Sequence, residues 1–149
     1  MVRVLVTGVS SGGKTTVLDE LRRRGHMTMD TDYDGWELYD GTWDERRMEG
    51  LLASESDVVV SGTVENQGRF YDRFEYVVLL SAPLDVLLER VSRRTNNPYG
   101  HCIEHQVAIA HYQRTVEPLL RRGSSLELDG RRLVPELADA IAQLIEQTP

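Results

Sequence analysis

Near the start of the chain, several glycines precede a lysine and two threonines at a spacing that could bind phosphate. Gly8-Val-Ser-Ser-Gly-Gly-Lys-Thr15 matches the pattern G-x-x-x-x-G-K-[ST]. Glycines let successive backbone N–H groups turn inward around an anion, and a following helix adds its positive N-terminal end. In this pattern Lys14 reaches the β- and γ-phosphates, Thr15 binds Mg²⁺ and Thr16 contacts the α-phosphate. The predicted nucleotide-binding residues here are Gly8, Val9, Ser10, Ser11, Gly12, Gly13, Lys14, Thr15 and Thr16.

Two carboxylates, Asp30 and Asp32, follow the second apolar run of the chain. A carboxylate can orient an attacking hydroxyl and accept its proton, and phosphoryl transfer depends mainly on positioning and charge neutralisation. On an extended stretch, side chains at i and i+2 point the same way, so both are expected to face the glycine-rich loop. The alternative is a solvated acidic turn that closes at Asp34-Gly35.

These residues need a scaffold in which strands and helices alternate. Short β-branched runs alternate with segments of helical periodicity. The predicted strands are 2–7, 26–29, 57–61, 76–80 and 126–128. The predicted helices are 14–25, 43–54, 83–94, 104–122 and 133–147, with a helical turn at 69–74. The helix over 104–122 is expected to break near Pro118. The sequence therefore predicts a three-layer α/β fold, with a five-stranded parallel sheet and helices on both faces. Ligands of such folds bind beyond the carboxyl ends of the strands.

The composition narrows the class of protein. The chain has 149 residues, 40% of them hydrophobic, and no apolar run approaches the roughly 20 residues of a membrane span. Its net charge of −7 disfavours non-specific binding to nucleic acid or to an acidic membrane, so neither is expected as a partner. A single cysteine, Cys102, leaves no internal disulfide, and we expect a cytoplasmic protein. Lys14 is the single lysine among 17 basic residues, and an ammonium suits a tight phosphate loop better than a guanidinium does.

Together, these motifs resemble the small P-loop kinases of the adenylate kinase, shikimate kinase and gluconate kinase group, within the P-loop NTPase superfamily. The resemblance covers nearly the whole chain and implies one domain over residues 1–149. It implies an acceptor-binding segment at about 31–56 and an arginine-bearing lid at about 94–103. Met29-Asp-Thr-Asp32 resembles the D-x-D of shikimate-type kinases, which implies that Asp30 helps to hold Mg²⁺ and that Asp32 binds the acceptor hydroxyl.

Further acceptor residues follow from the same resemblance. Arg46 resembles the acceptor-binding arginine of shikimate kinases, and its alternative role is an exposed ion pair with Glu49. Gly62 stands where those kinases have a glycine triplet, and either lets the backbone approach the acceptor or belongs to a turn. Aromatic residues of this segment either stack on a planar or sugar-like acceptor or form a small core, which we favour: Tyr33, Trp36, Tyr39 and Trp43.

The segment after the fourth strand resembles the lid and the adenine side of this group. Arg90 matches the arginine that packs on adenine, and a guanidinium over an aromatic face is a favourable contact. Arg93 or Arg94 would neutralise charge on the transferring phosphoryl group, and we take Arg94 as the catalytic candidate. Leu128-Asp129-Gly130 resembles the final loop near the adenine, so Asp129 is predicted to bind nucleotide. The spacing of His101, Cys102 and His105 is too irregular to predict a zinc site.

The sequence thus predicts an ATP- and Mg²⁺-dependent kinase that phosphorylates a hydroxyl or phosphate of a small molecule. Its predicted catalytic residues are Lys14, Asp32 and Arg94. A nucleoside monophosphate kinase is one alternative, and a nucleotide-binding regulatory ATPase without a small-molecule acceptor is another. The sequence does not name the acceptor.

Overall fold

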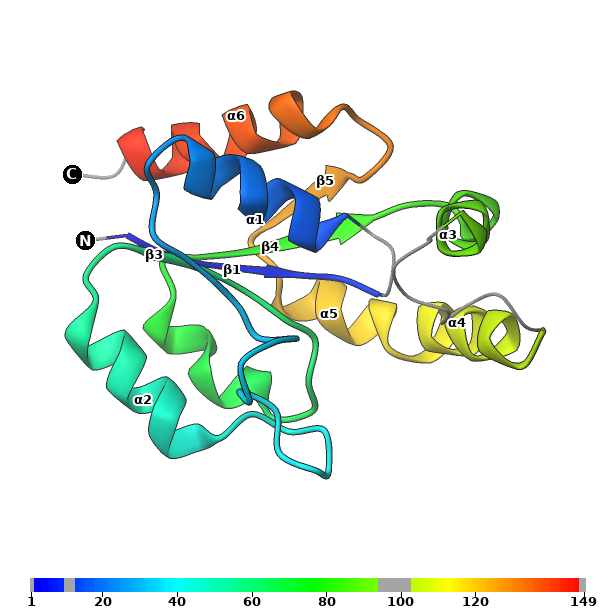
Figure 1. Cartoon of the computed structure of the whole chain (residues 1–149), viewed down its shortest axis with the longest axis horizontal. Helices are drawn as coiled ribbons and strands as arrows, with labels where there is room; N and C mark the ends of the chain where they lie inside the picture. The colour runs from blue at the N-terminus through cyan, green and yellow to red at the C-terminus, as the bar shows by residue number, and fades with distance from the viewer. Residues whose placement is uncertain (1, 10–12, 94–102, 148–149) are drawn as a thin grey trace.

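The computed structural model describes residues 2–9, 13–93 and 103–147, in which strands and helices alternate as predicted (Figure 1). The strands are β1 (Arg3–Thr7), β2 (Thr28–Asp30), β3 (Val58–Ser61), β4 (Tyr76–Ser81) and β5 (Leu126–Asp129). The helices are α1 (Lys14–Arg23), α2 (Glu45–Ser54), the 3-10 helix η1 (Gln67–Arg73), α3 (Leu84–Ser92), α4 (Ile103–Thr115), α5 (Glu117–Gly123) and α6 (Val134–Gln147).

The five strands form one parallel sheet in the order β2-β3-β1-β4-β5. The glycine-rich loop leaves the central strand β1, and β3 and β4 flank it. The register pairs Ser61 with Val6 on one side and with Asp30 on the other. Because the strands are parallel, their carboxyl ends lie at one edge of the sheet, and the residues that follow strands β1 to β4 meet there.

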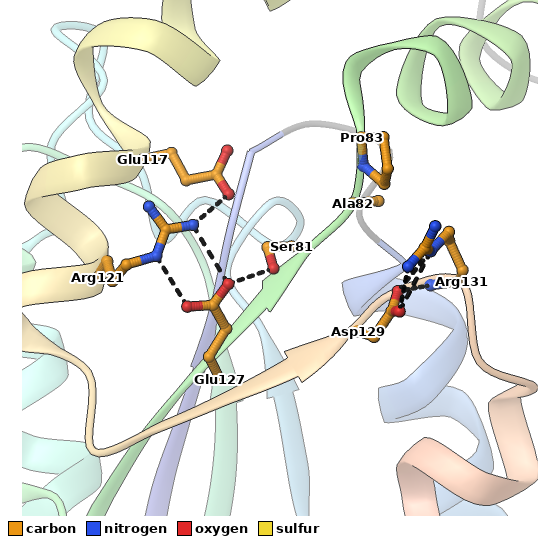
Figure 2. Close-up of a pocket in the computed structure, with 8 residues that line it drawn as sticks. All are labelled: Ser81, Ala82, Pro83, Glu117, Arg121, Glu127, Asp129 and Arg131. Carbon is orange, nitrogen blue, oxygen red and sulfur yellow. Dashed lines mark hydrogen bonds and ion pairs between the residues drawn. The ribbon is translucent and has the colours of Figure 1, made fainter.

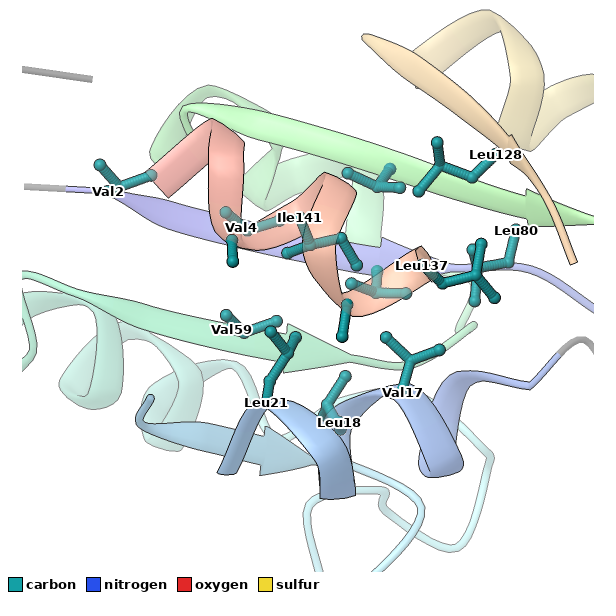
Figure 3. Packing of buried hydrophobic residues seen from close by; sticks show 14 residues of the cluster. Val2, Val4, Val17, Leu18, Leu21, Val59, Leu80, Leu128, Leu137 and Ile141 are labelled. Atoms are coloured by element: carbon teal, nitrogen blue, oxygen red, sulfur yellow. The ribbon is translucent and has the colours of Figure 1, made fainter. Parts of the chain in front are cut away.

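Helices cover both faces of this sheet, as the alternation predicts (Figure 1). On one face, Val17, Leu18 and Leu21 of α1 pack with Leu137 and Ile141 of α6 against the strands (Figure 3). The other face carries α2, η1 and α5, and a second cluster there is built from the following residues: Leu5, Val58, Val60, Val77, Trp36, Trp43, Met48, Leu52, Phe70 and Phe74. The predicted three-layer fold is confirmed.

One boundary differs from the predicted one in a place that matters for the site. β2 extends to Asp30, so this carboxylate belongs to the strand rather than to the turn after it. The predicted 104–122 helix is broken as expected: α4 ends at Thr115, and α5 begins at Glu117 with Pro118 in its first turn, where a missing N–H is tolerated. Within the described ranges, no helix is long and apolar enough to cross a membrane.

Candidate functional site

The start of the glycine-rich loop is closely packed. Gly8 is buried, and a Cβ there would collide with the carbonyl oxygen of Leu80 on β4. At the end of the loop, Gly13 takes a left-handed conformation, with φ of 98°, directly before α1. Both positions therefore require glycine. Ser10, Ser11 and Gly12, also predicted to bind nucleotide, lie outside the described residues.

Lys14 begins α1 and turns back across the loop. Its Nζ donates to the carbonyl of Gly8 at 2.7 Å and lies 3.4 Å from that of Val9. The neighbouring Thr16 hydroxyl donates to the Gly13 carbonyl at 2.9 Å. The ammonium and the N-terminal end of the helix thus concentrate positive charge at the mouth of the loop, where an anion would bind.

A buried polar network, which the sequence motifs did not indicate, anchors the loop to β3 and η1. The Thr63 hydroxyl accepts from the backbone N–H of Gly8 at 3.2 Å and donates to its carbonyl. It also lies 3.1 Å from the Thr7 hydroxyl, which accepts from the Gln67 amide at 3.1 Å. The first residue of the loop is therefore held by the segment that follows β3.

The loop threonine and the first predicted aspartate are in contact. The Thr15 hydroxyl donates to Oδ2 of Asp30 at 2.8 Å. The other carboxylate oxygen of Asp30 accepts from the backbone N–H of Asp32 at 3.1 Å. Tyr33 N–H also bonds to the Asp30 carbonyl, so the chain turns here. The expected extended stretch over Asp30 and Asp32 is therefore wrong: only Asp30 lies in the strand, and Asp32 is an exposed residue of the turn.

A third carboxylate, Glu37, approaches these groups although no sequence motif marked it. Partial burial raises the pKa of Glu37, as do the negative charges of Asp32 and Asp30, whereas Lys14 opposes them. A bridge between Glu37 and Trp43 holds the loop backbone, together with the bond from Leu38 N–H to the Thr42 carbonyl. The Glu37 side chain still reaches the surface, so its removal from water is only partial. Its position follows from the fold of the loop, which spacing alone did not reveal.

The two tryptophans of the acceptor segment belong to the core, as favoured from the sequence. Trp36 and Trp43 are buried, whereas Tyr33 and Tyr39 are exposed. Trp43 Nε1 donates to the Thr31 hydroxyl at 2.9 Å, and this hydroxyl donates to the Ser61 carbonyl at 2.7 Å. This chain of hydrogen bonds fixes the acceptor segment against the end of β3.

Gly62 lies directly beside this chain of hydrogen bonds. A Cβ on Gly62 would collide with the Thr31 hydroxyl and lie 3.2 Å from two atoms of the Trp43 ring. Close packing thus accounts for the glycine, and its predicted contact with an acceptor stays a prediction.

Arg47 rather than Arg46 contacts the described acceptor segment. The Arg47 guanidinium lies 4.1 Å above the ring of Trp36 and donates to the Asp34 carbonyl at 2.6 Å. Arg46 is exposed on α2. The alternative pairing of Arg46 with Glu49 has a competitor, because Arg73 of η1 donates to Glu49 at 2.7 Å.

Arg90 joins the loop to the segment after β5. Its NH2 donates to the Gly130 carbonyl at 2.5 Å, and NH1 lies 4.0 Å from where a Cβ of Gly13 would stand. The predicted adenine-side residues Arg90 and Asp129 are therefore on neighbouring segments. Of the predicted lid arginines, Arg93 pairs with Glu89 at 2.6 Å. Arg94 and lid residues 95–102, which include Cys102, lie outside the described residues.

Asp129 borders a charged pocket of about 530 Å³ on the α5 side of the sheet (Figure 2). Arg131 bonds to both oxygens of Asp129, and this pairing holds the pKa of Asp129 at about 2. Across the pocket, Arg121 bonds to Glu127 at 2.8 Å and to the buried Glu117 at 3.0 Å. Burial raises the pKa of Glu117, although the charge of Arg121 opposes the shift. The charges of this pocket largely neutralise one another, unlike those at the glycine-rich loop.

Comparisons with known proteins agree with this fold. A family described as AAA domain matches residues 4–111. No curated protein matches the chain.

Solved structures similar to the chain include shikimate kinase from Acinetobacter baumannii in complex with shikimate, at 21% identity, with 97% of this chain and 93% of that chain covered and a TM-score of 0.73. Shikimate kinase from Bacteroides thetaiotaomicron has 18% identity, coverage of 97% and 98%, and a TM-score of 0.72. A sugar kinase from Janibacter sp. has 18% identity, coverage of 100% and 96%, and a TM-score of 0.63. At sequence identities this low, the structural similarity establishes the fold of the chain and not its activity. The predicted resemblance is confirmed: the chain belongs to the AAA-domain family, and its fold is that of the small P-loop kinases.

Proposed function

We propose that this protein is an ATP- and Mg²⁺-dependent kinase that transfers the γ-phosphoryl group of ATP to a hydroxyl of a small molecule. The observation that carries the proposal is the 2.8 Å hydrogen bond between Thr15 and Asp30. It joins the phosphate loop to the segment expected to bind the acceptor. The solved shikimate and sugar kinases that share the fold support the same class of reaction.

The nucleotide would bind along the loop and α1. Phosphate oxygens would offer the Lys14 ammonium stronger acceptors than the carbonyls of Gly8 and Val9, because hydrogen bonds between charged partners are the strongest ones. Arg90, held by Gly130 beside Gly13, would lie against the base, and Asp129 would border the same side.

The residues at the loop fit Mg²⁺. Thr15 and Asp30 offer a hydroxyl and a carboxylate, the hard oxygen donors that this cation prefers, in a position to bind it directly or through water. When bound, Mg²⁺ supplies positive charge to the β- and γ-phosphates. Lys14 adds its charge to the same oxygens.

Asp32 would orient the acceptor and accept its proton. In the transfer, a bond forms between the acceptor oxygen and the γ-phosphorus, the bond from that phosphorus to the leaving oxygen of ADP breaks, and the hydroxyl proton passes to the carboxylate. The negative charge of Asp32 raises the pKa of the neighbouring Glu37. Arg94 is the predicted lid residue for the developing negative charge, and Arg46 and Gly62 remain predicted acceptor contacts.

The charges around the acceptor segment favour a hydroxyl acceptor over a nucleoside monophosphate. A phosphate acceptor needs cationic side chains. Within the described acceptor segment the arginines are Arg46 and Arg47, and Arg47 already lies on Trp36. Three carboxylates interact electrostatically there instead: Asp30, Asp32 and Glu37.

Nucleotide binding and acceptor-dependent ADP release test the proposal together. Lys14→Ala should weaken ATP binding by roughly 10- to 150-fold, the equivalent of about 1.5–3 kcal/mol for hydrogen bonds to a charged group, as measured by calorimetry. Arg22→Ala, which removes an exposed partner of Asp19 on the same helix, is the matched control and should bind normally.

ADP release should then rise with a hydroxylated metabolite in a screen that also contains nucleoside monophosphates. Unchanged ATP affinity in Lys14→Ala would refute the site. Stimulation by monophosphates alone would assign the alternative kinase, and tight ATP binding without stimulation by any acceptor would assign a regulatory ATPase.

A further inference from the structure

The side chain of Gln67 is buried, and its hydrogen bonds fix which way the amide points. Gln67 begins η1 and is 3% exposed. The backbone N–H of Val64 bonds to one end of the amide at 2.9 Å. Because a backbone N–H can only donate, that end is the amide oxygen, and the other end is the NH2 group with two protons to donate. The NH2 group donates to the Thr7 hydroxyl at 3.1 Å and to the Tyr71 hydroxyl at 2.9 Å.

This orientation sets the direction of the hydrogen bonds that lead from Gln67 to the glycine-rich loop. The buried Thr7 hydroxyl accepts from Gln67, so its own proton needs another acceptor. Among the described residues, that acceptor is Oγ1 of Thr63, at 3.1 Å. Thr63 Oγ1 then accepts from both Thr7 and the Gly8 N–H, and it gives its own proton to the Gly8 carbonyl.

The Gly8 carbonyl is the point at which these hydrogen bonds meet Lys14. Its oxygen accepts from Nζ of Lys14 at 2.7 Å as well as from the Thr63 hydroxyl. A carbonyl oxygen has two lone pairs, so it can hold both donors at once. When the ammonium turns to a phosphate, the buried carbonyl still keeps Thr63 as a donor. Without that donor, the move of Lys14 would leave a buried backbone group unpaired, which is unfavourable.

We infer that Gln67 is a positioning residue for phosphate binding, because it makes the Thr63 hydroxyl donate to the Gly8 carbonyl and so allows Lys14 to turn to the phosphates. This inference rests on the proposed function, in which the loop binds a triphosphate. Gln67 acts through Thr7 and Thr63 rather than on the ligand itself. An amide suits this place because it accepts from Val64 at one end and donates at the other, whereas a carboxylate would only accept and would reverse the direction.

Gln67→Met removes the amide at nearly constant size, and calorimetry with inorganic tripolyphosphate measures the effect. Because the Thr63 proton is then no longer directed to Gly8, affinity should fall by roughly 3- to 10-fold, as expected for one hydrogen bond. In the Lys14→Ala background, the same substitution should leave affinity unchanged, because the amide acts through the ammonium. Equal weakening in both backgrounds would indicate a distorted loop and would overturn the inference.

Asn66→Leu is the matched control. Asn66 carries the neighbouring amide, whose described partners are the Trp43 backbone and Glu45. Loss of either amide should lower the urea midpoint, but Asn66→Leu should leave tripolyphosphate affinity unchanged. Equal weakening of phosphate binding by Asn66→Leu and Gln67→Met would assign the effect to general destabilisation and would also overturn the inference.

Two substitutions of Thr63 keep the test decisive if Gln67→Met does not fold. Thr63→Ser retains the hydroxyl and should bind tripolyphosphate as the wild type does. Thr63→Val should bind it roughly 10-fold more weakly, because the Gly8 N–H loses its acceptor as well. Wild-type affinity in Thr63→Val or in Gln67→Met would contradict the inference and leave the proposed function intact. A wild-type protein that binds neither tripolyphosphate nor ATP would instead refute the proposed function, and the inference with it.

Discussion

Gly62→Ala tests whether packing against the acceptor segment, rather than access for a ligand, explains the glycine after β3. The new methyl group would overlap the Thr31 hydroxyl and press on two atoms of the Trp43 ring at 3.2 Å. Overpacking of this kind costs about 1–3 kcal/mol. Displacing Thr31 would also weaken its hydrogen bonds with Trp43 and with the Ser61 carbonyl, each worth about 0.5–1.5 kcal/mol.

The expected loss is therefore about 2–4 kcal/mol in the free energy of unfolding, equivalent to roughly 5–15 °C in Tm for a domain of this size. Urea unfolding followed by circular dichroism measures it. Gly50→Ala is the control: this residue lies within α2 with open space around it, so alanine should stabilise the protein by about 0.5–1 kcal/mol.

A double-mutant cycle identifies the colliding atom. Thr31→Ala alone should destabilise the protein, because Trp43 Nε1 loses its acceptor. Combined with Gly62→Ala it removes the collision, so the double variant should lose about 1–2 kcal/mol less than the sum of the two single losses. Wild-type stability of Gly62→Ala, accompanied by a raised acceptor KM, would refute the packing explanation and favour direct contact with the acceptor.

Two further substitutions test the electrostatics of the site and its adenine side. The raised pKa of Glu37 means that the folded protein holds the Glu37 carboxyl proton to a higher pH than the ordinary pKa of 4.5 would give. Ionisation of Glu37 therefore lowers the free energy of unfolding as pH rises through the folded pKa. Glu37→Gln should therefore be more stable than wild type in urea at pH 7 and gain nothing below about pH 4, and an equal gain at both values would exclude the charge effect. Arg90→Ala removes the group held by Gly130 beside Gly13 and should weaken ATP binding by roughly 5- to 30-fold, the equivalent of about 1–2 kcal/mol, while inorganic tripolyphosphate binds as before. If calorimetry showed that ATP and tripolyphosphate lose affinity equally, Arg90 would contact the phosphates instead of the base.

The layers of the fold were predictable because their signals are local and repeated. The strands are short apolar runs, mostly rich in β-branched residues, and α1, α2, α3 and α6 each have an apolar stripe, so periodicity gave most of the alternation. The break between α4 and α5 followed from the missing N–H of Pro118. The close packing of Gly8, the left-handed conformation of Gly13 and the Lys14 ammonium against the Gly8 carbonyl agree with the motif, while phosphate binding by these residues stays a prediction.

The acceptor side was less predictable because its contacts join residues that are distant in sequence. The turn after Asp30 depends on hydrogen bonds to its own carboxylate and carbonyl, and an extended stretch was expected instead. Glu37 approaches Asp30 and Asp32 only because the loop folds back through its bridge with Trp43. Likewise, the burial of the Ser61 hydroxyl without a hydrogen-bond partner among the described residues depends on both neighbouring strands. Such features depend on tertiary contacts rather than on composition or period.

The half-buried ammonium that crosses the glycine-rich loop is also the sole side-chain amine of the whole sequence. An acylating reagent selective for primary amines thus has a single side-chain target, and that target lies where a triphosphate would bind. Reagent uptake counted by mass spectrometry would report occupancy of the loop directly, because a ligand on the ammonium shields it from the reagent. The only background is the terminal amine of the backbone, which a tryptic peptide map separates.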